Sequence, residues 1–139
     1  MTDRYTIRVD GIPAPQARPR LFVAGGHARA YSPKTNWFSL VYAKALENRP
    51  KAPMDGPIGI ACRFIFPRPK SVKKDEIWKY SRPDIDNLIK ACMDALGEAR
   101  WFIDDGRISS LSILKCYDGE LDPPGAVIHM YRLPEWVGQ

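Results

Sequence analysis

The segment RPDIDNLIKACMDAL, residues 82–96, places two aspartates two positions apart where a helix is expected to begin. Pro83 disfavours helical backbone at the preceding residue and suits a helix start, so Asp84 should lie in an extended lead-in. In extended backbone, side chains two residues apart point to the same side. Asp84 and Asp86 can therefore converge as oxygen ligands for a hard divalent cation. A structural interpretation stays open, because aspartate also caps helices, and Asp86 and Lys90 form an i, i+4 pair.

A second acidic pair follows in WFIDDGRI, residues 101–108. Asp-Gly is a frequent turn pair, so Asp104 and Asp105 also have a structural interpretation. A helix of about fourteen residues is about 20 Å long, so this turn must double back to approach Asp84. Its leading apolar residues favour inward packing. If the turn returns, three or four carboxylates meet, and a bound cation would offset their mutual repulsion.

Such a cluster is suited to phosphodiester hydrolysis. A bound magnesium ion polarises the phosphoryl group, lowers the pKa of the attacking water and stabilises the leaving oxygen. Lys90, one turn beyond Asp86, can hold the scissile phosphate. Residues 82–107 carry four basic and six acidic side chains, a net charge of −2, which leaves +7 for the remainder of a chain whose net charge is +5. A DNA backbone would be attracted to the chain as a whole, with cations filling the acidic island.

The pattern DIDNLIKACMDAL followed by WFIDD resembles the signature of the RusA-type Holliday junction resolvases, and the segments PAPQARPR and AYSP resemble the N-terminal half of phage-associated members. The resemblance implies a small α+β homodimer that binds four-way DNA junctions and cuts two strands symmetrically with Mg²⁺ or Mn²⁺. Carried over by position, the resemblance implies that the metal-binding and catalytic carboxylates are Asp84, Asp86 and Asp105. It implies that Lys90 is the catalytic lysine and that Asp104 is a less critical aspartate of the metal site.

Several basic residues are candidates for contacts with DNA phosphates, which position a nucleic acid without reading its sequence. Arg82 is the strongest, because it adjoins Asp84. A solvated charged surface is the alternative for each of them. The other candidates are Lys90, Arg18, Arg20, Lys34, Lys73 and Lys74. Two aromatics, Trp78 and Tyr80, either stack on bases opened at the junction or simply pack.

The predicted elements form one domain over residues 1–139, an α+β fold in which a mixed β-sheet packs with two main helices. A proline-bounded segment, residues 67–83, is expected to carry at most one helical turn. The two strands at the C-terminal end are read as antiparallel and joined by the LDPP loop. The elements are a strand over 5–13, a hairpin over 20–31 turning at Gly25-Gly26, a helix over 34–49, a strand over 58–66, a helix over 84–96, and strands over 107–119 and 125–133.

The sequence argues against several other classes. No stretch of eighteen apolar residues and no signal-peptide pattern is present, so a cytoplasmic protein without a membrane partner is expected. The three cysteines lack CxxC spacing, which favours reduced buried thiols over disulfides or zinc. No GxxxxGK[ST] motif is present, so no nucleotide cofactor is expected. Two rival functions stay open: a non-catalytic junction-binding protein, and a nuclease for other branched or flap DNA.

Overall fold

The computed structural model describes residues 4–17, 20–31, 34–119 and 122–134. Its centre is a four-stranded sheet in the order β1-β6-β4-β5. Strands β4 and β5 are parallel, whereas β6 is antiparallel to both β1 and β4. The strands are β1 (Arg4–Asp10), β4 (Ile58–Phe66), β5 (Ile108–Tyr117) and β6 (Gly125–Arg132). The α+β class and the mixed sheet are therefore confirmed.

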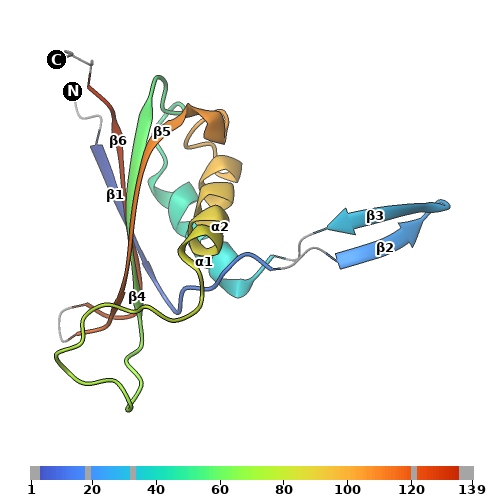
Figure 1. The fold of residues 1–139 in the computed structure, drawn as a ribbon. Coiled ribbons are helices and arrows are strands. Elements are labelled where there is room, and N and C mark those ends of the chain that lie inside the picture. Colours follow the sequence, from blue (N-terminus) through green and yellow to red (C-terminus); the bar gives the residue numbers. More distant parts are fainter. Residues whose placement is uncertain (1–3, 18–19, 32–33, 120–121, 135–139) are drawn as a thin grey trace, which may run out of the picture.

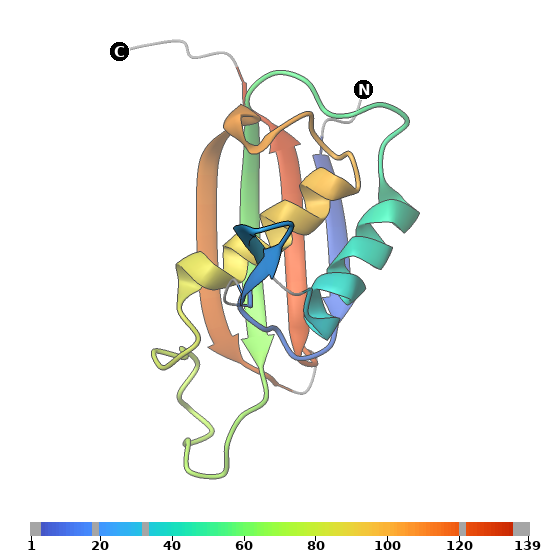
Figure 2. The same cartoon turned by 90° about the vertical axis from the view of Figure 1, so that its right-hand side faces the viewer.

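Two helices, α1 (Asn36–Asn48) and α2 (Ile85–Glu98), cover one face of the sheet (Figures 1 and 2). The Thr35 hydroxyl caps α1 by accepting a hydrogen bond from the Phe38 backbone N–H at 3.1 Å. Helix α2 is the crossover between β4 and β5, because two parallel strands cannot be joined by a tight turn. It runs antiparallel to both strands, so the C-terminal end of β5 returns to the beginning of α2.

The last two strands run in opposite directions, as predicted, but they do not pair, because β4 lies between β5 and β6 and hydrogen-bonds to both. The side chains of β4 are buried along most of its length, which is typical of a strand in the interior of a sheet. Segment 67–83 carries two hydrogen-bonded turns, in which the Val72 and Glu76 backbone N–H groups donate to the Pro69 and Lys73 carbonyls, and no helix. Part of the segment instead lies along β5, where the Lys79 backbone N–H donates to the Lys115 carbonyl at 3.1 Å.

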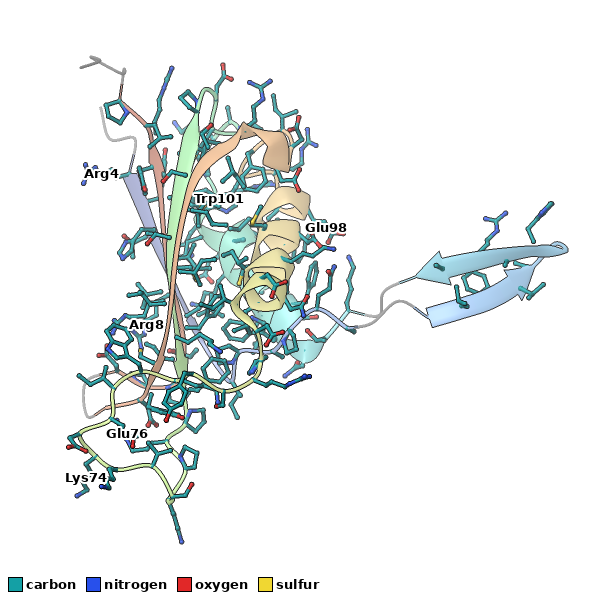
Figure 3. The ribbon with its side chains drawn as sticks, viewed as in Figure 1. Arg4, Arg8, Lys74, Glu76, Glu98 and Trp101 are labelled. Atoms are coloured by element: carbon teal, nitrogen blue, oxygen red, sulfur yellow. The ribbon has the colours of Figure 1, made fainter. Side chains whose placement is uncertain are left out.

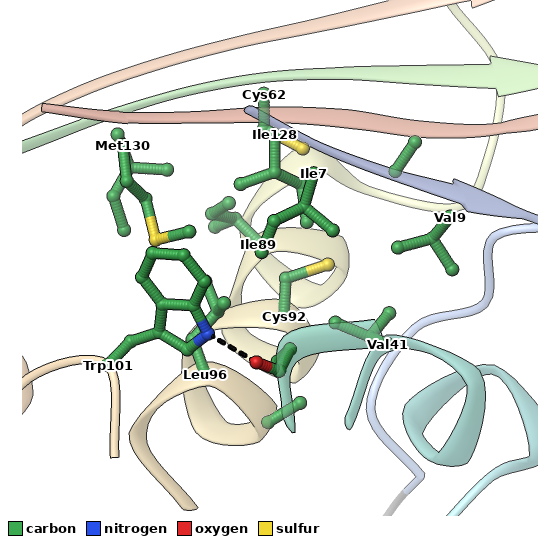
Figure 4. Close-up of a cluster of buried hydrophobic side chains, with 14 of the residues drawn as sticks. Ile7, Val9, Val41, Cys62, Ile89, Cys92, Leu96, Trp101, Ile128 and Met130 are labelled. Carbon is green, nitrogen blue, oxygen red and sulfur yellow. Dashed lines mark hydrogen bonds between the residues drawn. The ribbon is translucent and has the colours of Figure 1, made fainter. Parts of the chain in front are cut away.

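The hydrophobic core lies between the sheet and the helices, and Figure 4 shows part of it. Trp101 is fully buried and donates its indole Nε1–H to the Ala45 carbonyl of α1 at 2.8 Å. The three cysteines are free and buried, as expected. A hydrogen bond with Cys92, together with burial, raises the pKa of the Cys62 thiol well above its ordinary value. No helix in the described part of the chain is long and apolar enough to span a membrane.

One element stands apart from this body. Strands β2 (Arg20–Ala24) and β3 (His27–Tyr31) form an antiparallel hairpin, hereafter the arm, which projects away from the sheet and helices (Figure 1). Its turn is Gly25-Gly26, as predicted. Both glycines have positive φ, +60° and +78°, a conformation that other residues adopt at a cost.

Candidate functional site

The N-terminal end of α2 carries the first predicted aspartate outside the helix. Asp84 occupies the N-cap position with φ −73° and ψ 146°, which is extended backbone, as the preceding proline predicted. Its side chain makes no capping hydrogen bond. A capping aspartate normally accepts a backbone N–H of the first turn. The exposed Asp84 carboxylate is therefore available to a ligand, because it occupies the N-cap position without a side-chain capping bond.

Asp86 and Lys90 follow on the first two turns of α2, and both side chains are exposed. Within the described residues, neither makes a hydrogen bond or an ion pair, so the i, i+4 pair does not form. An ionised carboxylate accepts hydrogen bonds on both oxygens and coordinates hard cations well. Asp86 thus presents a free oxygen ligand, and Lys90 a free cation, on the same side of the helix one turn apart.

Lys115, which the sequence reasoning did not select, holds the lead-in to α2. Its Nζ donates to the Ser81 carbonyl at 2.6 Å and to the Pro83 carbonyl at 2.7 Å. Burial, with the neighbouring charge of Lys79, lowers the pKa of the Lys115 ammonium, whereas the charge of Asp84 acts in the opposite direction. The backbone on the N-terminal side of Asp84 is therefore fixed from the far end of β5.

The position of Lys115 in its strand could have identified it from the sequence pattern. It lies opposite the core residue Phe64 in the parallel pair, so it is on the face of β5 that carries Ile113. A lysine among inward-facing apolar positions must reach polar partners, because an unpaired ammonium is costly to bury. Such a residue commonly marks a functional or structural hydrogen-bonding site.

An open groove of about 820 Å³, hereafter the N-terminal groove, runs beside this end of α2. Asp84 lies in its wall, together with Lys79 and Arg82. Two aromatic side chains on segment 67–83 are strongly exposed, Trp78 at 57% and Tyr80 at 90%. The stacking interpretation therefore stays open for both, since their rings are not committed to the core.

A second hollow of about 410 Å³, hereafter the C-terminal recess, lies at the other half of α2. Its carboxylates mostly have partners in the protein. Asp94 accepts from the Gln16 side-chain amide at 2.7 Å, and Glu98 forms an ion pair with Lys34 at 2.7 Å. Asp104 accepts the Gly106 backbone N–H at 2.8 Å and so caps the short 3₁₀ helix at Asp105–Arg107.

Asp105 differs from its neighbours in the C-terminal recess. Its side chain is exposed and makes no hydrogen bond or ion pair within the described part of the chain. The structural interpretation therefore fits Asp104, which builds the turn, but not Asp105. This division parallels the resemblance, which made Asp104 the less critical of the pair.

The expected meeting of all these carboxylates is not found within one chain. Among the described residues, no group of three or more aspartate, glutamate, histidine or cysteine side chains is placed to hold a metal ion. Asp84 lies in the N-terminal groove and Asp105 in the C-terminal recess. The fourteen residues of α2 span about 21 Å. Trp101 keeps the turn at the far end, because it is buried and its carbonyl accepts the Met54 N–H at 2.7 Å.

The predicted DNA-binding residues fall into three groups. The first group is exposed and has no ion pair in the described residues; it consists of Arg82, Lys90, Lys73 and Lys74. Figure 3 shows Lys74 at the outer end of the loop that extends beyond the sheet, away from Glu98 on the helical side. Lys34 is instead engaged by Glu98. Arg18 and the side chain of Arg20 lie outside the described residues.

Comparison with known proteins gives independent evidence on the family of this chain. Residues 10–131 match the family described as endodeoxyribonuclease RusA. The chain is 32% identical over 130 residues to the protein YqaN of Bacillus subtilis (strain 168), and the match covers 85% of this chain and 91% of that protein. It is 30% identical over 121 residues to the crossover junction endodeoxyribonuclease rusA of Lactococcus phage r1t, with the same coverages. The matched region includes α2, the turn after it and Lys115.

Proposed function

The chain belongs to the RusA endodeoxyribonuclease family, and we propose that it resolves four-way DNA junctions as a homodimer that requires a divalent cation. The observation that carries the proposal is the set of carboxylates without protein partners. Asp84, Asp86 and Asp105 are exposed and free of hydrogen bonds and ion pairs within the described chain, whereas three nearby carboxylates are all engaged.

The donor chemistry fits Mg²⁺ or Mn²⁺, because free carboxylate oxygens are the ligands that hard cations prefer. When bound, such an ion polarises the phosphodiester and lowers the pKa of the attacking water. Within one chain, only Asp84 and Asp86 lie at the start of α2, so the predicted set of three metal-binding aspartates is incomplete there. A second copy of the chain would supply that third ligand, so that Asp84 and Asp86 of one copy face Asp105 of the other.

The chain's own residues would hold and orient the DNA. Lys115 fixes the backbone before Asp84 through its two carbonyl contacts. Arg82, exposed in the N-terminal groove, and Lys90, exposed on α2, would each contact a phosphate oxygen next to the scissile bond. Trp78 and Tyr80 would stack on bases opened near the crossover. A two-fold dimer would present two equivalent sites to a junction of approximate two-fold symmetry.

The activity is tested with a synthetic four-way junction and with matched linear and flap DNAs, each with Mg²⁺ or with a chelator. We expect paired nicks across the junction only when the metal is present. Binding without cleavage would favour a non-catalytic junction protein, and equal cutting of the flap substrate would favour a general branched-DNA nuclease. Either outcome would overturn the proposed activity.

The shared site is tested with dimers of two different variants, purified through two affinity tags. One copy carries Asp86→Asn and the other Asp105→Asn. If each site draws on both copies, one of the two sites in this mixed dimer keeps all its aspartates, and nicking of one strand returns. If each site lies within one copy, both sites are defective and no nicking returns.

A matched control separates complementation from residual activity. A mixed dimer of Asp84→Asn and Asp86→Asn copies has one defect at each α2 entrance, so it should stay inactive under either arrangement. Recovery of nicking in this control would mean that the single variants retain activity, and it would contradict the assignment of Asp84 and Asp86 as metal ligands.

A further inference from the structure

The arm has one apolar face that this chain does not cover. Leu21 is 80% exposed and Val23 is 78% exposed. In the hairpin register these residues lie opposite Ala30 and Ala28. Residues directly opposite each other share a face, and alternate residues share it too, so these four apolar side chains form one surface.

Such a surface is unusual for a hairpin in water. A two-stranded hairpin without further packing is marginally stable at best. A contiguous exposed apolar patch commonly marks an interaction site. The arm also carries arginines at positions 20 and 29 and no acidic residue between positions 20 and 31. A partner for the arm should therefore offer an apolar floor and a negative charge.

The C-terminal recess offers both. Its lining includes Met93 and Ile103, and Ile103 is 54% exposed. Its acidic residues outnumber the single lysine, Lys34, that lines it; they are Asp94, Glu98, Asp104 and Asp105. The charge of this recess is thus opposite to that of the arm, and its apolar part matches the arm's uncovered face.

The base of the arm lies at this recess. Ala17, close before β2, and Lys34, close after β3, both line the C-terminal recess, while Ala17 also lines the N-terminal groove. The arm therefore starts beside both hollows. It points away from the sheet and helices (Figures 1 and 3). A two-fold axis near this base would place the arm of one copy beside the recess of the other, because contacts in an isologous interface are reciprocal.

We propose that the apolar face of the arm docks in the C-terminal recess of a second copy of this chain, each copy inserting its arm into the other. This inference rests on the homodimer of the proposed function and deepens it by naming the surface. It also brings the N-terminal groove of one copy toward the recess of the other, which is the arrangement that a metal site shared between copies needs.

Cross-linking tests the contact directly. One copy carries Val23→Cys and a differently tagged copy carries Ile103→Cys. The three native cysteines are buried, so the introduced thiols are the reactive ones. Mild oxidation of the mixture should give a disulfide-linked heterodimer on a non-reducing gel. Pairing Val23→Cys with Ile77→Cys, which is exposed on the loop at the other end of the molecule, should give none. An absent Val23–Ile103 band from a dimeric sample would overturn the arm contact and leave the homodimer standing.

Oligomeric state gives a second readout. The double variant Leu21→Asp/Val23→Asp should weaken dimerisation at least ~100-fold, because it places charge on the face that docks. Light scattering after size exclusion should then report the 15.8 kDa monomer where the natural chain gives twice that mass. The control Ile77→Asp/Tyr80→Asp, also at exposed positions, should stay dimeric.

Each remaining result has a defined meaning. Circular dichroism checks that the double variant folds, and if it does not, the cross-linking decides the matter. A folded double variant that stays dimeric would overturn the proposal. If it stays dimeric and loses affinity for junction DNA, the arm is a DNA contact instead.

Discussion

The two ends of α2 carry similar numbers of carboxylates and use them differently. At the N-terminal end, Asp84 and Asp86 have no hydrogen bond or ion pair within the described residues, and Lys115 fixes the backbone before them. At the C-terminal end, Asp94 and Glu98 are engaged by side chains of other segments. Acidic residues that look alike in the sequence thus differ in whether the fold gives their carboxylates a hydrogen-bonding partner.

The difference separates structural from functional carboxylates. Asp104 and Asp105 are adjacent, yet one caps a turn and the other is free. A carboxylate that already accepts a strong hydrogen bond contributes to stability and is less available to a cation. A free, exposed one contributes little to stability and can be removed without harm to folding. Four predictions follow from this contrast, from the largest expected effect to the smallest.

Neutralising a free carboxylate should remove activity and spare the fold. We expect Asp86→Asn or Asp105→Asn to lower single-turnover junction cleavage in Mg²⁺ by at least about 100-fold, because a catalytic metal supplies several kcal/mol of transition-state stabilisation. The melting temperature and metal-free junction binding should be unchanged or improved. The matched control Asp94→Asn should retain cleavage. Full cleavage by Asp86→Asn would contradict the functional role of the free carboxylates at the N-terminal end of α2.

Removing the lysine that fixes the N-terminal end should have an intermediate effect. Lys115→Met lacks the donors to the Ser81 and Pro83 carbonyls, so the position of Asp84 loosens. We expect cleavage to fall about 10-fold, since misplaced catalytic groups lose rate steeply. The Mg²⁺ concentration at half-maximal rate should rise, which a loss of stability alone would not cause. Lys115→Arg keeps hydrogen-bond donors and should recover part of the rate.

Removing an engaged carboxylate should destabilise the chain and spare cleavage. We expect Asp104→Ala to lower the free energy of unfolding by about 1 kcal/mol, the usual loss for a helix cap, as measured by urea denaturation. Cleavage at a temperature well below the melting point should stay within about twofold of the natural rate, a change of less than 0.5 kcal/mol. A rate loss like that of Asp105→Asn would make both aspartates functional.

The smallest effect is expected for a basic residue that already has a partner. Lys34→Met should change stability by less than about 1 kcal/mol, as is typical of an exposed ion pair. Its junction affinity should show nearly the natural salt dependence. Arg82→Met, which removes an unpaired cation of the N-terminal groove, should reduce the slope of log affinity against log salt by about one. Equal slopes for the two variants would remove this distinction.

The local elements followed from the sequence because local rules decide them. Pro83 predicted an extended Asp84 and a helix directly after it. The glycine pair predicted the turn of the arm, because only its two positive φ angles join the strands tightly. The apolar run at 58–66 became β4 with the same bounds. The metal-ligand and DNA-binding assignments of individual residues stay predictions.

What only the tertiary structure decided is which segment returns to Asp84. The sequence identified the carboxylates, the α+β class and the family resemblance through residue types and short spacings. Which segment packs next to Asp84 depends on the order and direction of the strands in the sheet, and the periodicity of the side chains does not specify these. Because β4 and β5 are parallel, the crossover helix α2 runs against both, and the turn with Asp105 must lie at its far end. The strand after that turn therefore brings back Lys115 rather than a third aspartate.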